Sequence, residues 1–285
     1  MSQSRITSIS GPTASLNFIG IPYSDIDRTG HWAVWRISKM FEAARLLSLL
    51  AGFVDYRKIV DEDHALAIIK QQLNLDPELQ RASLTPAMKL NFDVELIQLK
   101  QTSFTIVTNL KNGTTGKILG ENFMKIVRIN RTTRRSSSFP EWFYKKYAAF
   151  MNIPGHPSTE KEELPEIPKN AYKYDVIPGH SDEDVNCHLN QSSYIRFCMD
   201  AATSASLNGY YEHYTRDMCL YPSIQWTISY VGESIAGDQL TIFTWQKEHT
   251  PDNIQFAIER NGNLIFYAST IFGKIAKEKI HWHKL

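Results

Sequence analysis

The sequence has few cysteines and no long apolar run, and both absences narrow the class of protein. Its three cysteines, Cys187, Cys198 and Cys219, are too few for a disulfide framework and form no Cys-x-x-Cys pair. No apolar stretch approaches the roughly 18–20 residues of a membrane-spanning helix. We therefore expect a protein without a membrane span in a reducing compartment, with the cytoplasm as the default.

An excess of charge is absent too. The chain has 31 Lys and Arg against 30 Asp and Glu, a formal net charge of +1, which gives no reason to expect a nucleic-acid partner. Its first 24 residues contain no acidic residue and no apolar signal-peptide core, so we expect a short flexible lead into the first strand. A length of 285 residues accommodates two domains of about 100–150 residues each.

A polar motif occurs twice in the chain. Residues 24–31 read SDIDRTGH and residues 181–188 read SDEDVNCH, and the offset is constant because 181 − 24 and 188 − 31 both equal 157. Each copy precedes a stretch whose apolar residues recur at helical spacing. An Asn-Gly dipeptide, the commonest signal of a two-residue hairpin, follows in each half at residues 112–113 and 261–262. Two markers in the same order predict a duplicated domain.

Each half is predicted to contain one long helix and one antiparallel sheet. The helices are expected at residues 32–51 and 190–208. Strands are expected at residues 15–23, 65–75, 89–99, 103–110 and 117–129 in the first half, and at 172–177, 223–230, 239–246, 254–259 and 264–275 in the second. Each helix has an apolar face too wide to leave in water, so its sheet should wrap it. The predicted fold class is α+β.

Two predicted domains, residues 1–130 and 172–285, are joined by a linker over residues 131–171. Its first part is basic and contains a predicted aromatic-faced helix at residues 140–150; the basic residues around it are Arg128, Arg131, Arg134, Arg135, Lys145 and Lys146. Its second part is an extended acidic tether with Pro154, Pro157, Pro165, Pro168, Glu160, Glu162, Glu163 and Glu166. The basic part is either a solvated surface or a docking patch for an acidic carrier.

Three residues of the second motif carry side chains suited to catalysis. Asp184, Asn186 and His188 lie at i, i+2 and i+4 directly before the predicted helix. A helix N-terminus carries partial positive charge and unpaired N–H groups, so a developing oxyanion can be stabilised there. The simpler alternatives are that Asp184 and Asn190 cap the helix and that His188 is a packing residue.

Metal binding by this motif is not expected. Residues 182–186 read like the start of an EF-hand loop, but Cys187 replaces the required Gly and Ser193 replaces the closing Glu. Cys187, His188 and His180 do not have the spacing of zinc ligands. We therefore expect no metal and no other cofactor.

The run from Ser181 to Tyr194, with its following helix and its upstream copy, resembles the tandem hotdog-fold acyl-ACP thioesterases of fatty-acid synthesis. The resemblance implies two hotdog domains, each a long helix wrapped by a curved antiparallel sheet. It implies that Asp184, Asn186 and His188 are the family's Asp-x-Asn-x-His segment. It also implies that Glu233 occupies the Glu of a family Glu-Cys pair, with Ser234 in place of the cysteine.

Thioester hydrolysis fits these residue types. Water needs a base, and Glu233 is our candidate, although the sequence leaves open whether Glu233 or Asp184 takes the proton. Asn186 would orient the carboxylate or the water, and His188 would polarise the carbonyl or protonate the departing thiolate.

Four further residues are expected to contact the substrate. The N–H groups around Leu189 and Asn190 should face the oxyanion, and Tyr194 and Ser234 should line the site.

The upstream copy is expected to be degenerate, because Thr29 stands where the second copy has Asn186 while Asp27 and His31 are retained. The first half should then shape the acyl pocket and complete a pseudo-dimer within one chain, with a homodimer of such chains as a further option.

The expected function is hydrolysis of a fatty-acyl or polyketide-like thioester carried on acyl carrier protein or coenzyme A. Two alternatives stay open: a hotdog dehydratase or hydratase acting on 3-hydroxyacyl or enoyl thioesters, and a non-catalytic acyl-binding module.

Overall fold

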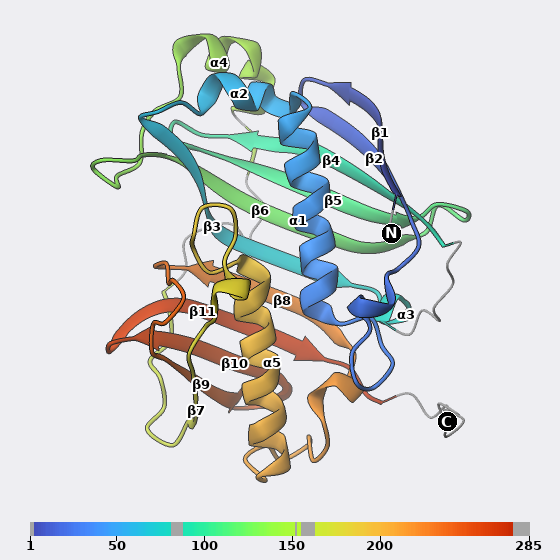
Figure 1. Cartoon of the computed structure of the whole chain (residues 1–285), viewed down its shortest axis with the longest axis vertical. Coiled ribbons are helices and arrows are strands. Elements are labelled where there is room, and N and C mark those ends of the chain that lie inside the picture. The colour runs from blue at the N-terminus through green and yellow to red at the C-terminus, as the bar shows by residue number, and fades with distance from the viewer. Residues whose placement is uncertain (1–2, 81–87, 152, 155–162, 276–285) are drawn as a thin grey trace.

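Two long helices lie on one face of a single antiparallel sheet. The computed structural model describes residues 3–80, 88–151, 153–154 and 163–275. Within them, 11 strands form one sheet, and α1 (Val34–Leu50) and α5 (Gln191–Leu207) run across its face (Figure 1). The α+β class is therefore confirmed.

The strands divide between the two halves of the chain. The first half contains β1 (Gln3–Ser10), β2 (Thr13–Ile19), β3 (His64–Leu75), β4 (Lys89–Leu99), β5 (Ser103–Asn112) and β6 (Ile118–Asn130). The second half contains β7 (Tyr172–Val176), β8 (Ser223–Tyr230), β9 (Leu240–Lys247), β10 (Thr250–Arg260) and β11 (Asn263–Phe272). Most predicted strands differ from these by one to four residues at an end.

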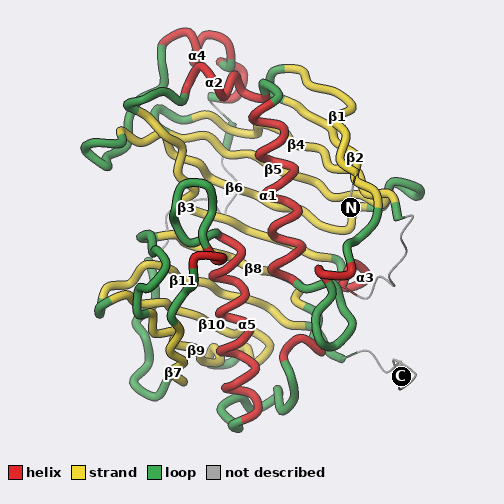
Figure 2. The backbone as a smooth tube through the Cα atoms, viewed as in Figure 1, coloured by secondary structure: helices red, strands yellow, loops and turns green. Residues whose placement is uncertain are grey.

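The sheet is nearly symmetric about its centre, where β3 pairs with β8. The strand order is β1-β2-β4-β5-β6-β3-β8-β11-β10-β9-β7, so each half reads outward from the centre in the same pattern. Both long helices have 17 residues, and their first and last residues differ by the offset of the repeated motif, since 191 − 34 and 207 − 50 both equal 157. The repeat seen in the sequence therefore corresponds to equivalent elements in space, as Figure 2 shows.

The core lies between the helices and the sheet. In the first half, Phe41 of α1 packs edge-on against Phe92 of β4 at 5.4 Å between ring centroids. In the second half, Tyr194 of α5 stacks on Phe266 of β11 at 5.0 Å. Buried residues alternate along β4, as expected for a strand with one face on a core. Each such aromatic ring contributes about 1.5–3 kcal/mol by leaving water.

The two Asn-Gly dipeptides form different turns. Asn261 and Gly262 have φ values of 52° and 73° and join β10 to β11 directly, so this two-residue hairpin is confirmed. The prediction for residues 112–113 is wrong, because the chain continues to residue 117 before β6 begins. There the Asn112 carboxamide oxygen accepts hydrogen bonds from the N–H groups of Thr114 and Thr115, and these bonds stabilise a longer loop.

The N-terminus also departs from expectation. Residues 3–10 were expected to be a flexible lead, but they form β1, which pairs with β2 along nearly its whole length. The turn between them contains Gly11 at φ +52°, a conformation that glycine adopts without strain. Burial alternates along β2, whereas the residues of β1 are almost all exposed, so β1 is held by its backbone pairing with the edge of β2.

Shorter helices fill the connections. These are η1 (Tyr23–Asp25), η2 (Phe53–Asp55), α2 (Tyr56–Ile59), α3 (Pro77–Gln80), η5 (His180–Asp182) and η6 (Met218–Leu220). The helix predicted at 140–150 is α4 (Glu141–Lys146) followed by η3 (Ala148–Phe150). Its aromatic face is confirmed, since Phe143 stacks on Phe139 at 4.7 Å. The tether residues 155–162, with Pro157, Glu160 and Glu162, lie outside the described residues.

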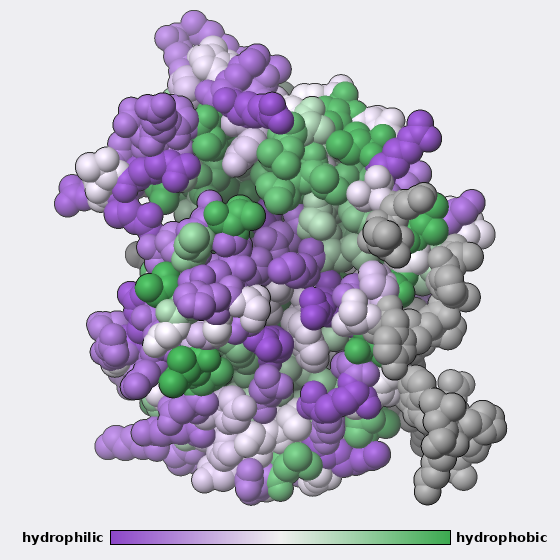
Figure 3. Space-filling model, viewed as in Figure 1, coloured by the Kyte–Doolittle hydropathy of each residue, from purple (hydrophilic) through white to green (hydrophobic). Residues whose placement is uncertain are grey.

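The surface differs between the two helices. Leu46 and Leu50 on the outer side of α1 are 40% and 45% exposed, and Figure 3 shows a hydrophobic area over the upper part of this helix, whereas the surface over α5 is more mixed. Among the helices formed by the described residues, none combines the length and apolar character needed to cross a bilayer.

Candidate active site

The loop before α5 is a tight turn fixed by its own backbone. The Asp184 N–H donates to the His188 carbonyl at 2.8 Å, and the Cys187 N–H donates to the Asp184 carbonyl at 3.0 Å. Cys187 is exposed and has φ 58°, a left-handed conformation that costs a side-chain-bearing residue roughly 1 kcal/mol. The turn places the side chains of Asp184 and His188 at the start of the helix.

Asp184 and Asn186 are brought together within this turn. One carboxylate oxygen of Asp184 accepts the Asn186 backbone N–H at 2.7 Å, and the other accepts the Asn186 carboxamide at 3.3 Å. Both oxygens of Asp184 therefore hold Asn186, which is itself exposed. This arrangement restricts the carboxamide to few orientations, as in an Asx turn.

His188 and Glu233 also meet, although they come from different elements. Glu233 lies in the loop after β8, and its Oε2 is 3.6 Å from Nδ1 of His188. The same oxygen is 2.6 Å from Nη2 of Arg134, a residue of the turn that follows β6 in the first half. The side chains of His188, Glu233 and Arg134 are 39%, 45% and 53% exposed, so the cluster is open to solvent.

The prediction for Leu189 and Asn190 as oxyanion donors is wrong. The Leu189 N–H donates to the Ser234 carbonyl at 2.7 Å, and the Asn190 N–H donates to the Asp182 carbonyl at 2.8 Å. These bonds attach the loop to its neighbours, so neither donor is available. Asn190 instead caps α5, because its side-chain oxygen accepts the Ser192 N–H.

Tyr194 and Ser234 are buried supports in this structure. Ser234 is fully buried, and its hydroxyl donates to Asp238 at 2.9 Å. Tyr194 is 3% exposed, and its burial raises the pKa of the phenol. Both residues hold the loop that carries Glu233, and their contact with a substrate stays a prediction.

The first copy of the motif repeats the backbone but not the surroundings. Asp27 accepts hydrogen bonds from the N–H and hydroxyl of Thr29 at 2.8 and 2.7 Å, much as Asp184 holds Asn186. The His31 ring, however, lies 3.1 Å from the carbonyl of Cys219, and the Thr29 hydroxyl lies 3.3 Å from the same oxygen. The segment around Cys219, in the second half, therefore packs against this copy of the motif.

Sequence reasoning missed two residues beside the second motif. Arg134 was seen only as part of a basic stretch. Glu42 of α1 was not considered, yet the Asn190 carboxamide nitrogen lies 3.0 Å from both of its carboxylate oxygens. Neither contact has a signal in the sequence, because each joins residues more than 90 positions apart.

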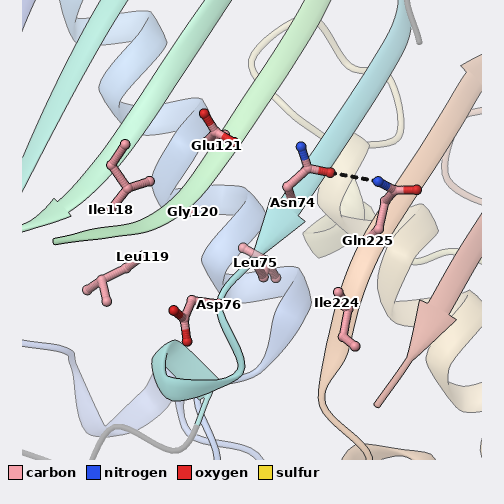
Figure 4. Close-up of a pocket in the computed structure, with 9 residues that line it drawn as sticks. All are labelled: Asn74, Leu75, Asp76, Ile118, Leu119, Gly120, Glu121, Ile224 and Gln225. Carbon is pink, nitrogen blue, oxygen red and sulfur yellow. Dashed lines mark hydrogen bonds between the residues drawn. The ribbon is translucent and has the colours of Figure 1, made fainter. Parts of the chain in front are cut away.

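An open depression of about 330 Å³ lies elsewhere, at the end of β3 between β6 and β8 (Figure 4). It is lined in part by Asp76 and Glu121, and an Asn74–Gln225 hydrogen bond of 3.0 Å crosses it. None of the predicted site residues lines it, and its carboxylates do not suit an acyl chain. Among the described residues, no group of three His, Cys, Asp or Glu side chains could hold a metal ion.

Comparisons with known proteins give matches in structure only. No model of a known protein family matches the sequence, and no curated protein does. An acyl-ACP thioesterase from Bacteroides thetaiotaomicron is 15% identical with a TM-score of 0.67, covering 91% of this chain and 97% of its own. The 12:0-ACP thioesterase from Umbellularia californica is 14% identical with a TM-score of 0.72, covering 93% and 98%.

A third solved structure agrees with these two. A protein described as an oleoyl thioesterase from Lactobacillus plantarum is 13% identical with a TM-score of 0.72, covering 94% of this chain and 98% of its own. At such low identity the likeness establishes the fold. The α+β arrangement described above is therefore a hotdog fold over more than nine-tenths of the chain.

Proposed function

We propose that this chain, which has the hotdog fold of the acyl-ACP thioesterases, hydrolyses an acyl thioester carried on acyl carrier protein or coenzyme A. One observation carries the proposal: Glu233, from the loop after β8, meets His188 at the start of α5, next to the turn in which Asp184 holds Asn186. A carboxylate, a carboxamide and an imidazole in one solvent-open cluster supply what water attack on a thioester needs. The acyl group is fatty or polyketide-like.

In this proposal Glu233 is the general base. Both oxygens of Asp184 are engaged by Asn186, whereas the shortest contacts of Glu233 with His188 and Arg134 are both to Oε2. Glu233 thus has an oxygen to spare for a water molecule, and Asp184 orients Asn186. His188 stabilises the charge that develops on the carbonyl or protonates the leaving thiolate.

Arg134 holds Glu233 in place. Its guanidinium lies 2.6 Å from Oε2 of Glu233 and restricts where that carboxylate can point. Because Arg134 belongs to the first half and Glu233 to the second, the active site is shared between the halves.

We also propose that residues 1–130 and 172–285 are two hotdog domains joined by the linker 131–171. The matching strand orders and the equal helix offsets support this division. The two domains form a pseudo-dimer across β3 and β8. The first domain, with its closed copy of the motif, shapes the acyl pocket rather than performing catalysis.

The test is release of free thiol from a panel of acyl-CoA and acyl-ACP thioesters, measured beside a Glu233→Gln variant. Release that depends on Glu233 supports the proposal. Release that is equal in the variant refutes the role of Glu233. No release from any thioester would refute hydrolysis and would favour the dehydratase or the binding module, which 3-hydroxyacyl thioesters would then separate.

A further inference from the structure

A second polar cluster lies behind the proposed active site, where α1 meets α5. Asn190, the cap of α5, donates to both oxygens of Glu42 at 3.0 Å. This contact satisfies the carboxylate of Glu42 and ties the two long helices together. Three other polar side chains nearby, those of Arg45, Gln71 and Gln191, have weaker or fewer hydrogen-bond partners.

Arg45 is the first of them. It follows Glu42 by three residues, so the two side chains lie on the same side of α1. Among the contacts of the described residues, its hydrogen-bond partner is the thioether sulfur of Met124, at 2.7 Å from Nη1. Burial lowers the pKa of this guanidinium, and the negative charge of Glu42 opposes the shift only in part. A thioether is a weak acceptor, so the part-buried guanidinium of Arg45 can exchange this contact for a stronger acceptor.

Gln71 places a second donor beside Arg45. The register of the sheet sets Gln71 of β3 directly opposite Met124 of β6 and Ile228 of β8. Directly opposed side chains have Cβ atoms about 4.5–5.5 Å apart. Gln71 is fully buried, and its oxygen accepts the Tyr230 hydroxyl at 2.8 Å, while its Nε2 has no partner.

Gln191 adds both a donor and an acceptor. It is the first residue of α5 and is 8% exposed, and neither polar atom of its side chain has a partner. It lies one turn before Tyr194, whose ring is 6.2 Å from that of Tyr230. Helical side chains lean toward the N-terminus, here toward the loop that carries His188. The first half has Val34 at the equivalent position, so the duplicated fold does not require an amide there.

We propose that Arg45, Gln71 and Gln191 form an internal subsite for an oxygen on the acyl chain, so the substrate is an acyl thioester bearing a carboxylate or a keto group. This inference rests on the proposed hydrolysis. A plain alkyl chain would leave the buried amide donors of Gln71 and Gln191 unpaired and the Arg45 charge on a weak acceptor, whereas a carboxylate or carbonyl oxygen accepts from all three. The subsite is close to the reacting centre in the chain, since Gln191 follows His188 by three residues and Tyr230 precedes Glu233 by three.

Matched substrates test the inference. The wild-type kcat/KM is measured for a plain acyl-CoA, a ketoacyl-CoA and an ω-carboxyacyl-CoA of equal chain length. We expect at least about a tenfold preference for an oxygen-bearing chain, because sites that hydrogen-bond a substrate discriminate strongly against one lacking the group. Arg45→Met should abolish the preference for the carboxylate, and Gln71→Leu or Gln191→Val should abolish the preference for the keto group.

Gln72→Leu is the control, since Gln72 neighbours Gln71 but points to the opposite face of β3. It should leave the ratios unchanged. A second readout is the rise in melting temperature that each thioester gives to the inactive Glu233→Gln protein. Stabilisation by an oxygen-bearing chain that depends on Arg45 supports the subsite even if no thioester is hydrolysed, in which case only the proposed function fails.

Equal turnover of all three chains, with no Arg45-dependent stabilisation, overturns the subsite and leaves hydrolysis standing. The melting temperatures of the variants themselves guard against misfolding: removing an unpaired buried donor should keep or raise them.

Discussion

The two copies of the repeated motif share a backbone conformation, but one is packed against protein and the other is open to solvent. In each, the aspartate N–H donates to the histidine carbonyl at 2.8 Å, and a residue with positive φ, Gly30 or Cys187, closes the turn. The first copy is closed by the carbonyl of Cys219, whereas the second faces Glu233 and Arg134 in solvent. The segment opposite a repeated turn therefore decides whether the turn is covered by protein or open to solvent, and in our proposal the open copy is the catalytic one.

The two copies also differ in the ion pairs that hold them in place. Arg28 in the first copy binds Asp217 of the second half through two contacts, at 2.5 and 2.8 Å. In the second copy, Asp182 is held by Arg196 of the following helix, within the same half. The first copy thus contacts the other half through a charged residue of its own turn, whereas the second site contacts the first half through Asn190 and Glu233 beside the turn.

The largest expected effect is on the base. Glu233→Gln removes the proton acceptor while keeping the shape of the side chain, so we expect turnover to fall by about 10²-fold or more with the fold intact. Thiol release measures it, and near-ultraviolet circular dichroism checks the fold. A loss under threefold would refute the assignment of Glu233.

Asn186 and Thr29 hold equivalent positions and give the most direct test of the comparison. Asn186→Ala should lower kcat by about 10²-fold, because the group that orients the carboxylate or water is lost. Thr29→Ala should do little to kcat. Equal losses in the two variants would show that both copies act in catalysis.

Variants of Arg134 distinguish a role in positioning Glu233 from a role in docking the carrier. Arg134→Ala should lower kcat severalfold for both carriers, in keeping with the roughly 0.2–1 kcal/mol of an exposed ion pair, and Arg134→Lys should restore part of it. The double variant Arg131→Ala/Arg135→Ala should instead raise KM for a protein carrier and leave the CoA ester unchanged. If the double variant leaves carrier kinetics unchanged, the basic stretch is a plain solvated surface.

The Arg28–Asp217 ion pair should make the free energy of unfolding depend on pH. Burial raises the pKa of Asp217, but hydrogen bonds from Arg28 and the Cys219 N–H outweigh it and lower the pKa below its usual value. A lowered acid pKa contributes stability above the unfolded value, near pH 4, that is lost as pH falls through the folded value. Arg28→Ala should cost about 1 kcal/mol at pH 7 and progressively less below pH 4 in urea titrations.

The smallest expected effect concerns the turn itself. Cys187→Gly relieves the positive φ and should stabilise the fold by about 0.5–1 kcal/mol, whereas Gly30→Ala introduces the same strain and should cost about 1 kcal/mol. Urea unfolding of both variants measures the difference. Two changes of the same sign would mean that the turns are not equivalent.

Short-range patterns account for what the sequence predicted correctly. The helices at residues 34–50 and 191–207 follow from apolar spacing, and β4 and β8 were predicted at their observed bounds. The predictions failed where a side chain competes with the backbone, as Asn112 does in its loop, or where a polar strand is recruited by a sheet edge, as in β1.

The sequence by itself determined the repeated motif, the α+β class and the turn in which Asp184 holds Asn186, because each is read from a pattern of residues close together in the chain. Only the tertiary structure decided that Arg134 contacts Glu233, that Cys219 closes the first copy and that Arg45 contacts Met124, the residue opposite Gln71 in the sheet. These contacts follow from the pairing of β3 with β8 and from the packing of two helices on one sheet. Such long-range geometry depends on the whole fold, so no local pattern encodes it.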